Sequence, residues 1–398
     1  MKLVVLGAGV SGIAAGKLGE KLGYETRIVE DKSCTVLPDA DLYVTSPGLF
    51  PGRSKLYQQA AGSGKEFIGE LAFAARFYRN TMLAVTGTNG KTTTTELTTF
   101  LLNSLNIPAV SAGNIGLPLS ELCLQEQHPV AVVETSNFQL ELAPDFSPHA
   151  AVLLNLASDH EDRYPGGFTE YCAVKRKIFN HVKQENRIYG LSFADKPHRA
   201  TVKDHVLYIG QNRVLDLSST RLCAPHNAEN LAAATELLLR MVPEEKLLDD
   251  AFIRAVCAFV PGRHRVEILG EKNHVLFVND SKATNPAAVL AAAESFDRKL
   301  VLLLGGLDKG MDFSALARIE PKLRAAILYG EAGEKIGNCL KQTPKRCCGM
   351  DFEKAFAAAL EMAAPGDCIL LSPACASMDM FKNYQERGDV FRKLFECL

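Results

Sequence analysis

Short runs of β-branched and leucine-rich residues alternate with longer amphipathic stretches along the whole chain. The apolar runs have the length of strands, and the stretches between them have the spacing of helices. This alternation is typical of α/β proteins built on parallel sheets. It predicts strands at residues 2–7, 26–30, 42–45, 82–86, 130–134, 150–154, 275–278, 299–304, 325–329 and 367–371.

The helical stretches divide the pattern into three segments that each contain a strand–turn–helix unit. They predict helices at residues 9–22, 70–78, 169–182, 228–241 and 244–259, and a further helix that begins after Lys91. A chain of 398 residues is long enough for two or three domains. We therefore predict a three-domain α/β protein. Its parts are a Rossmann-like N-terminal domain (1–69), a central P-loop ATPase-like domain with a mainly parallel sheet (70–260) and a C-terminal Rossmann-like domain (261–398).

Charge and cysteine content narrow the function classes. The formal net charge of −2 gives no basic excess, which argues against binding along a nucleic-acid backbone. The eleven cysteines are irregularly spaced, which is typical of a reduced intracellular protein. The first residues predict a buried strand rather than a signal peptide, and no apolar stretch is long enough to span a bilayer. We expect a soluble cytoplasmic protein with no membrane insertion.

The strongest local motif follows the predicted strand 82–86. It reads Thr-Gly-Thr-Asn-Gly-Lys-Thr-Thr and leads directly into an amphipathic helix. Glycines let backbone N–H groups turn toward phosphate oxygens, and the helix N-terminus attracts anions. The motif departs from the usual phosphate loop, because Val85 stands where that motif has glycine. The alternative without a nucleotide is a turn that only caps the following helix. As a phosphate loop, the motif predicts nucleotide contacts from Gly87, Thr88, Asn89, Gly90, Lys91, Thr92 and Thr93.

A second glycine turn lies between the first strand and the first helix. Taken alone, this Gly-Ala-Gly-Val-Ser-Gly turn predicts a dinucleotide site, with an acidic residue near Glu30. It supports the main alternative, an oxidoreductase that uses a nicotinamide or flavin cofactor. That alternative leaves the phosphate loop unexplained. The candidate ligand residues of this turn are Gly9, Val10, Ser11 and Gly12.

Further polar residues follow predicted strands in the central segment. Glu134 ends an apolar strand, where a carboxylate can hold Mg²⁺ beside a triphosphate, although a surface acid is the simpler reading. His160 follows the strand 150–154 and is ambiguous alone. Lys175 belongs to a basic helical stretch that would ordinarily face solvent. Asn227 and Asn230 are three residues apart, so their amides can share one helix face, or one can simply cap the helix.

Three strand ends in the last segment carry lysine, aspartate and hydroxyl groups. Asp280 and Thr284 follow one strand, Lys309 follows the next, and Ser377 follows the last predicted strand. Cations with small hydroxyls suit an anionic amino acid and a phosphate. Cys375 has no sequence cue for a paired base, so we interpret it as a packed small residue.

Taken in order, these motifs closely resemble the Mur ligase family, and most nearly its D-glutamate-adding branch. The resemblance rests on the phosphate loop and on the motifs at residues 261–265 (Pro-Gly-Arg-His-Arg), 280–285 (Asp-Ser-Lys-Ala-Thr-Asn) and 372–377 (Ser-Pro-Ala-Cys-Ala-Ser). It covers nearly the whole chain. It implies an enzyme of peptidoglycan precursor synthesis that joins D-glutamate to UDP-N-acetylmuramoyl-L-alanine through an acyl-phosphate, with ATP and two Mg²⁺ ions, as a monomer.

Two alternatives share part of this chemistry. A sister ligase, of Mur or folate type, would add a different amino acid. A non-catalytic nucleotide-binding protein would bind ATP without releasing phosphate.

The resemblance also assigns roles to individual residues. The UDP-linked substrate would bind at Gly9, Val10, Ser11, Gly12, Ser46 and Asn114. ATP would contact the phosphate loop together with Asn227, Asn230, Arg265 and Asp280. D-glutamate would contact Thr284, Lys309, Ser377 and Tyr384. Thr92, Glu134, His160 and Lys175 would hold the metal ions, with Lys175 carbamylated. Lys91, His160 and Lys175 would be the catalytic residues.

The chain departs from the family pattern in three places. Asn137 stands where the family commonly has serine, and Tyr384 stands where phenylalanine also occurs. Only 33 residues separate Gly12 from Ser46. This spacing predicts that the N-terminal domain lacks a strand–helix unit, with residues 30–32 on the uracil side of the pocket.

Overall fold

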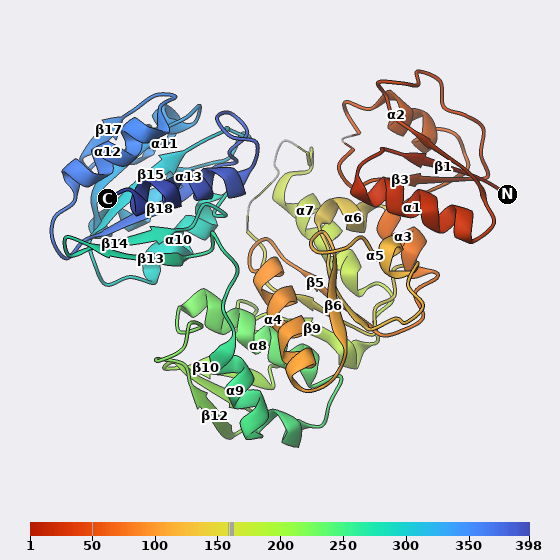
Figure 1. The fold of residues 1–398 in the computed structure, drawn as a ribbon, viewed down its shortest axis with the longest axis horizontal. Helices are drawn as coiled ribbons and strands as arrows, with labels where there is room; N and C mark the ends of the chain where they lie inside the picture. The colour runs from red at the N-terminus through yellow and green to blue at the C-terminus, as the bar shows by residue number, and fades with distance from the viewer. Residues whose placement is uncertain (50, 158, 160–162) are drawn as a thin grey trace. The chain divides into compact units, whose positions relative to one another are not determined.

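The structure is a computed structural model that describes residues 1–49, 51–157, 159 and 163–398. The chain forms two compact units. The first contains Met1–Leu156, Tyr171–Thr220 and Asn227–Phe259, and the second contains Ala157–Glu170, Arg221–His226 and Val260–Leu398. Both are built on mostly parallel sheets with helices beside them, which confirms the predicted α/β class (Figure 1).

The first unit begins with a four-stranded parallel sheet in the order β2-β1-β3-β4. Its strands are β1 (Lys2–Leu6), β2 (Glu25–Val29), β3 (Leu42–Thr45) and β4 (Glu66–Gly69), with helices α1 (Val10–Lys21) and α2 (Lys55–Ala61). The first three strands match their predictions closely, whereas β4 and α2 were not predicted. Residues 30–41, all of which the structure describes, form turns and irregular backbone without a helix. The link between β2 and β3 is therefore short.

A five-stranded parallel sheet follows, in the order β6-β7-β5-β8-β9. Its strands are β5 (Met82–Thr86), β6 (Ala109–Gly113), β7 (Val130–Glu134), β8 (Ala150–Leu153) and β9 (Arg187–Tyr189). Every residue of β5 is buried, because the strand lies in the middle of the sheet. The strand order reverses direction at β5. In open α/β sheets the carboxyl ends of strands at such a reversal form the ligand crevice.

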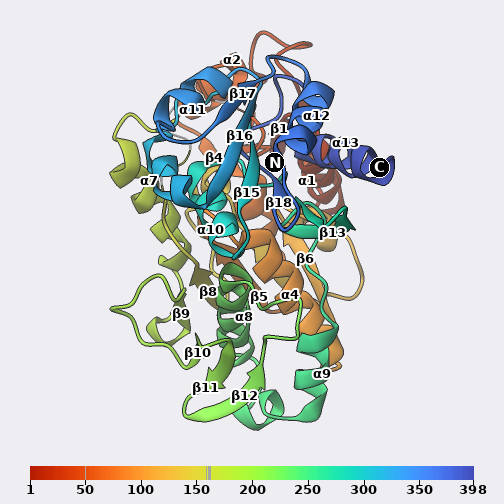
Figure 2. The same cartoon turned by 90° about the vertical axis from the view of Figure 1, so that its left-hand side faces the viewer.

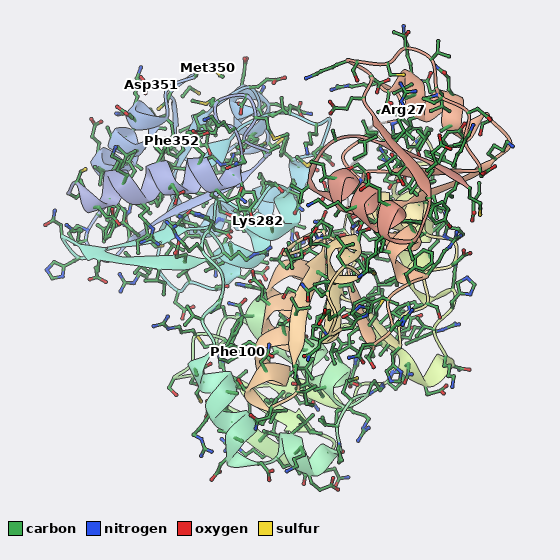
Figure 3. All side chains as sticks on the ribbon, turned by 45° about the vertical axis from the view of Figure 1, so that its right-hand side comes forward. Arg27, Phe100, Lys282, Met350, Asp351 and Phe352 are labelled. Atoms are coloured by element: carbon green, nitrogen blue, oxygen red, sulfur yellow. The ribbon has the colours of Figure 1, made fainter. Side chains whose placement is uncertain are left out.

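The other helices that lie wholly or largely in the first unit follow along the chain. They are α3 (Glu70–Ala75), α4 (Lys91–Ser104), α5 (Leu119–Leu122), α6 (Asn137–Glu141), α7 (Gly167–Arg176), α8 (Pro225–Leu238) and α9 (Asp250–Ala258). The predicted helix 169–182 ends at Arg176 and continues only as a 3₁₀ turn. The predicted helix 244–259 is broken, because Asp249 has an extended backbone. Phe100 of α4, labelled in Figure 3, packs edge-on against Phe259 after α9.

A small antiparallel sheet in the first unit was not predicted. It contains β10 (Ala200–Lys203), β11 (Val206–Ile209) and β12 (Asn212–Asp216). Figure 2 shows these strands next to α8. Glu236 of α8 accepts the backbone N–H groups of Arg199 and Ala200, so the helix fixes the edge of the small sheet.

The second unit is built on a six-stranded sheet in the order β13-β14-β18-β15-β16-β17. The strands are β13 (Glu267–Lys272), β14 (Val275–Asn279), β15 (Leu300–Gly305), β16 (Leu323–Tyr329), β17 (Lys345–Cys347) and β18 (Cys368–Ala374). Only β13 runs antiparallel to its neighbour. Helices α10 (Pro286–Glu294), α11 (Gly333–Cys339), α12 (Phe352–Met362) and α13 (Tyr384–Glu396), with a 3₁₀ segment at Ser314–Lys322, complete two apolar cores.

Candidate active site

The phosphate loop lies between β5 and α4, at the carboxyl edge of the central sheet. Gly90 caps α4 with a left-handed backbone, φ +83°. A Cβ atom there would also lie 2.2 Å from Asn230 Oδ1 of α8, so the position requires glycine. Asn230 Oδ1 accepts a hydrogen bond from Thr94 Oγ1 at 3.2 Å. The structure thus brings predicted nucleotide residues from α4 and α8 together.

Hydrogen bonds hold the loop in a turned conformation. Lys91 Nζ donates to the carbonyls of Gly87 and Thr88 at 2.9 and 2.7 Å. Asn155, which follows β8, accepts the Asn89 N–H at 2.9 Å and donates to the Asn89 carbonyl at 3.1 Å. Asn155 had no role in the prediction from sequence. Its signal was the position after a buried strand, where a side chain can reach a neighbouring loop.

Glu134 ends β7 at the same edge of the sheet. Its side chain is only 2% exposed, and Asn114 Nδ2 donates to Oε1 at 2.7 Å. The other oxygen, Oε2, is buried and has no hydrogen-bond partner among the described residues. Burying a carboxylate oxygen without a partner is costly, and a bound cation removes that cost. The residue therefore fits a Mg²⁺ ligand, since Mg²⁺ prefers carboxylate oxygens.

Lys175 is buried beside the phosphate loop, at 1% exposure. Its Nζ lies 4.9 Å from the ring centroid of Tyr171, and the Tyr171 hydroxyl lies 3.0 Å from Thr88 Oγ1. The basic helix α7 therefore turns Lys175 inward, although its composition alone suggested a solvated face. A buried lysine amine is less hydrated than an exposed one and is therefore a better nucleophile. Reaction with CO₂ requires such a nucleophilic amine.

The remaining members of the predicted metal set are placed only in part. Thr92 occupies the first turn of α4 and is partly buried. His160 lies outside the described residues. Within the described ranges, no group of three His, Cys, Asp or Glu side chains could hold a metal ion. A metal site would therefore depend on the mixed set that includes Thr92, Glu134 and a modified Lys175.

The first glycine turn lies at the carboxyl edge of the four-stranded sheet. A Cβ atom on Gly12 would lie 1.8 Å from the Gly7 carbonyl oxygen, so α1 begins with glycine packed against the turn. Ser46, after β3, donates its backbone N–H to the Leu6 carbonyl at 3.0 Å. Gly9 and Val10 are exposed, which leaves the start of α1 open to a ligand.

The second unit brings its own predicted residues together after β14 and β18. Asp280 is buried, accepting the Ser372 hydroxyl at 2.8 Å and the Val266 N–H at 3.2 Å. Burial raises the pKa of Asp280 to about 7, while these hydrogen bonds and the nearby Arg265 oppose the rise. Asp280 can therefore exist as a neutral acid or as a carboxylate near neutral pH.

The predicted amino-acid residues lie on three loops of the second unit. Ser377 is buried, and its hydroxyl has no hydrogen-bond partner among the described residues. Thr284 and Lys309 are partly exposed. Tyr384 begins α13, and Lys282 Nζ lies 4.0 Å from its ring centroid. A buried hydroxyl beside accessible cations can bind a carboxylate.

Arg387 of α13 connects these loops and was missed by the sequence analysis. It is fully buried and donates to Ser281 Oγ at 3.0 Å, to the Ser281 carbonyl at 2.8 Å and to the Cys375 carbonyl at 3.1 Å. In a helix with many charged residues, a single arginine gives no sequence signal of burial. Arg387 holds the loops after β14 and β18 together.

Fold and site together define a class of protein. A phosphate loop at the reversal point of a parallel sheet, with a buried carboxylate and a buried lysine beside it, is typical of enzymes that act on nucleoside triphosphates.

Comparison with known proteins identifies the family. The model of the Mur ligase middle domain matches residues 85–215, and that of the Mur ligase glutamate ligase domain matches residues 264–375. The chain is 35% identical to the UDP-N-acetylmuramoylalanine--D-glutamate ligase of Aquifex aeolicus, over 100% of this chain and 99% of the relative. The chain belongs to the Mur ligase family.

Solved structures support the same fold. UDP-N-acetylmuramate-alanine ligase from Thermotoga maritima matches with a TM-score of 0.64 at 16% identity, covering 100% of this chain and 99% of that one. The MurF ligase of the same organism, in complex with ADP, matches with a TM-score of 0.62 at 17% identity, covering 91% and 96%. Since the whole length of the chain matches ligases, the oxidoreductase interpretation of the first glycine turn is set aside.

Proposed function

We propose that this chain is an ATP-dependent ligase that joins D-glutamate to UDP-N-acetylmuramoyl-L-alanine in peptidoglycan precursor synthesis. One structural observation carries the ATP half of the proposal: Glu134, Lys175 and the phosphate loop share one edge of the central sheet. The full-length relative from Aquifex aeolicus, which is named for this D-glutamate reaction, supports the amino-acid half.

We assign the substrates to three domains. Residues 1–69 would bind the UDP-linked acid through Gly9, Val10, Ser11, Gly12 and Ser46, with Asn114 contributing from the central domain. Residues 70–260 would bind ATP through the phosphate loop with Asn227 and Asn230. Residues 261–398 would add Arg265 and Asp280 to the nucleotide site and bind D-glutamate through Thr284, Lys309, Ser377 and Tyr384.

Two Mg²⁺ ions are part of the proposal. The chain's own ligands would be the Thr92 hydroxyl, the orphaned Glu134 oxygen, His160 and a carbamate on Lys175. Carbamylation replaces a buried cation by an anion, which removes the conflict between Lys175 and a nearby metal. Bound Mg²⁺ would neutralise the phosphate charge that develops during phosphoryl transfer.

The proposed reaction has two balanced steps. The carboxylate of the UDP-linked acid attacks the γ-phosphorus of ATP, forming an acyl-phosphate while ADP leaves. The D-glutamate amine then attacks the acyl carbon, so that an amide forms and orthophosphate leaves with loss of a proton from the amine. Lys91, whose amine now bonds to loop carbonyls, would swing to the terminal phosphates. Lys309 would hold a D-glutamate carboxylate.

We also propose that the enzyme works as a monomer in the cytoplasm on small-molecule substrates. None of the helices in the described ranges is long and apolar enough to cross a membrane.

A phosphate-release assay tests the proposal. With ATP, Mg²⁺ and UDP-N-acetylmuramoyl-L-alanine, we expect release with D-glutamate and little with L-glutamate, L-alanine, L-lysine or other amino acids. Equal release with another amino acid would assign the chain to a sister ligase. If the chain bound ATP but released no phosphate with any amino acid, it would be a non-catalytic nucleotide-binding protein.

Two variants test the site within that assay. Lys91→Ala should abolish ADP release, while Lys203→Ala, which replaces an exposed lysine on β10, should not change it. Lys175→Ala should be nearly inactive and should recover part of its rate with acetate or another small acid that replaces the carbamate. A Lys175→Ala variant with a normal rate and no response to acetate contradicts the carbamate.

A further inference from the structure

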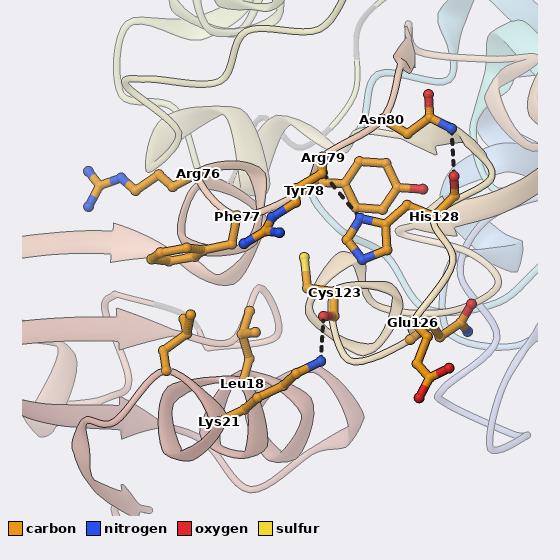
Figure 4. Close-up of a pocket in the computed structure, with 12 residues that line it drawn as sticks. Leu18, Lys21, Arg76, Phe77, Tyr78, Arg79, Asn80, Cys123, Glu126 and His128 are labelled. Carbon is orange, nitrogen blue, oxygen red and sulfur yellow. Dashed lines mark hydrogen bonds between the residues drawn. The ribbon is translucent and has the colours of Figure 1, made fainter.

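A second cavity in the first unit lies apart from the proposed ATP site. It has a volume of about 760 Å³ and is lined by the end of α1, by residues 76–80 and by residues around the end of α5 (Figure 4). Residues 76–80 precede β5, and residues 125–128 precede β7. The cavity therefore lies at the amino edge of the central sheet, whereas the phosphate loop lies at its carboxyl edge. A five-residue strand separates these edges by roughly 16 Å.

The charged groups that line the cavity are mostly cationic. They are Lys21, Arg76 and Arg79, against the single carboxylate of Glu126. Arg76 is engaged elsewhere, since it pairs with Glu66 and Asp145 and points away from the cavity in Figure 4. Lys21 Nζ donates to the carbonyls of Cys123 and Leu124 at 3.3 and 3.0 Å, which leaves one of its three N–H donors.

Arg79 supplies the main unused donors. Its backbone N–H donates to His128 Nδ1 at 3.2 Å, while its guanidinium forms no hydrogen bond or ion pair with any residue that the structure describes. The guanidinium carries five N–H donors in a planar fork, which matches the oxygens of a phosphate.

His128 adds a donor whose proton position follows from its contacts. Because Nδ1 accepts the Arg79 N–H, the neutral ring must carry its proton on Nε2. The ring is fixed in place, since it stacks on Tyr78 with centroids 4.8 Å apart and planes 6° from parallel. Asn80 Nδ2 donates to the His128 carbonyl and fixes the same segment from the other side.

We propose that this cavity binds a small phosphate-bearing anion. Arg79 would pair with the phosphate, with Lys21 and His128 Nε2–H completing its hydrogen bonds. None of these three residues belongs to the proposed ATP, metal or UDP sites. The cavity joins α1, which packs on the first sheet, to the segments that enter the central sheet, so a bound anion would link these two parts of the first unit.

Titration calorimetry with pyrophosphate tests the proposal. The full chain carrying Lys91→Ala lacks the main phosphate donor of the ATP site, so the pyrophosphate binding that a further Arg79→Gln substitution removes reports the second cavity. We expect this variant to bind pyrophosphate with a component of about one equivalent at the cavity. Adding Arg79→Gln should weaken that binding at least about tenfold, since charged hydrogen bonds of this kind contribute strongly. Adding Arg213→Gln, which replaces an exposed arginine on β12, should leave it unchanged.

Two results of the titration would contradict an anion site in this cavity. Absence of pyrophosphate binding to the Lys91→Ala chain would overturn the proposal, and so would binding that Arg79→Gln leaves intact. Thermal unfolding checks that Arg79→Gln remains folded, which we expect because its guanidinium forms no hydrogen bond or ion pair with a described residue. Arg79→Lys should keep part of the affinity, since it keeps the charge and loses the fork. Failure here would not affect the proposed ligase reaction, which phosphate release measures separately.

Discussion

Glu134 combines a structural cost with a chemical use. One carboxylate oxygen accepts a hydrogen bond from Asn114, and the other is buried without a partner among the described residues. A folded protein retains such a group only if something offsets the desolvation of its charge. In the proposed enzyme, Mg²⁺ does so during turnover. Without the ion, Glu134 destabilises the fold that positions it.

This conflict predicts that Glu134→Gln separates stability from activity. Glutamine can still accept the Asn114 hydrogen bond and removes a buried charge, so we expect the thermal midpoint without Mg²⁺ to stay equal or rise. Phosphate release should fall by at least about 100-fold, since a neutral amide is a poor Mg²⁺ ligand. Glu185→Gln, at an exposed position, serves as the control. A markedly less stable Glu134→Gln protein would mean that the carboxylate is structural.

Asp280 makes the stability of the second unit depend on pH. Burial raises its pKa from an ordinary value of 3.8 to about 7. Between these two values the unfolded chain ionises Asp280 while the folded chain keeps it protonated. The folded state then binds more protons, so the free energy of unfolding falls as pH rises through this window. Above about pH 7 both states are ionised, and the loss stops.

We therefore predict that Asp280→Asn flattens the pH dependence of stability. The difference between wild type and variant should change by up to about 1.4 kcal/mol per pH unit between about pH 4 and 7. Urea unfolding at one-unit pH intervals measures it. Parallel curves for the two proteins across this range would show that Asp280 is ionised in the folded state at low pH.

At the residue scale, the motifs and the resemblance singled out several positions that the structure brings together, although their roles stay predictions. The phosphate loop, Glu134 and Asn230 share one edge of the sheet, as their positions after strands or on a nearby helix suggested. Asn155 offered only its position after a strand, and Arg387 offered no sequence signal. Their importance comes from contacts with residues distant in sequence, which neither composition nor spacing reveals.

At the scale of elements, buried apolar strands were predictable and exposed mixed ones were not. All residues of β5, β7 and β18 are buried, so their sequences are apolar runs. The strands β12 and β17 expose several or all of their residues and lack this pattern. They form only because a neighbouring strand already supplies hydrogen-bond partners.

Helix α13 stabilises the second unit through one buried charge. Arg387 donates to the hydroxyl and carbonyl of Ser281 and to the carbonyl of Cys375. These acceptors belong to the loops after β14 and β18, and the second of these loops also holds Ser377. The helix therefore stabilises the loops of the predicted amino-acid site. The Arg387 side chain itself is placed to contact protein atoms rather than substrate.

Replacement of Arg387 should therefore lower the stability of the second unit. Arg387→Met keeps much of the volume but leaves two carbonyls buried without donors, so we expect a loss of about 3–5 kcal/mol in unfolding free energy. Arg387→Lys should recover only part, because it lacks the planar fork. Urea unfolding measures both, with Arg318→Met at an exposed position as the control. Equal stability of the Arg387→Met and Arg318→Met variants would show that solvent replaces the donors of Arg387.

At the scale of the whole molecule, the first unit is joined internally by buried polar contacts. The Gly69 N–H, at the end of the first sheet, donates to the Leu142 carbonyl at 2.7 Å. Glu70 accepts the Ser120 N–H at 2.8 Å, and burial raises the pKa of Glu70. These contacts explain why the first two sheets form one compact unit although the sequence pattern separates them into two segments.

The second unit, in contrast, should fold alone. Its two apolar cores lie on opposite faces of the six-stranded sheet, and all of their described members come from Val266 onward. A domain with its own core can fold independently of its neighbours. We predict that a fragment of residues 260–398 unfolds in one cooperative transition, followed by circular dichroism.

Leu302→Asp provides the control for that fragment, because Leu302 is fully buried on β15. A charge placed there cannot be hydrated without opening the core, so the transition should disappear at room temperature. If the native fragment also lacked a cooperative transition, the unit would depend on contacts with the rest of the chain.

In the full-length protein, Leu302→Asp should leave pyrophosphate binding at the Arg79 cavity intact, because that cavity is lined only by the first unit.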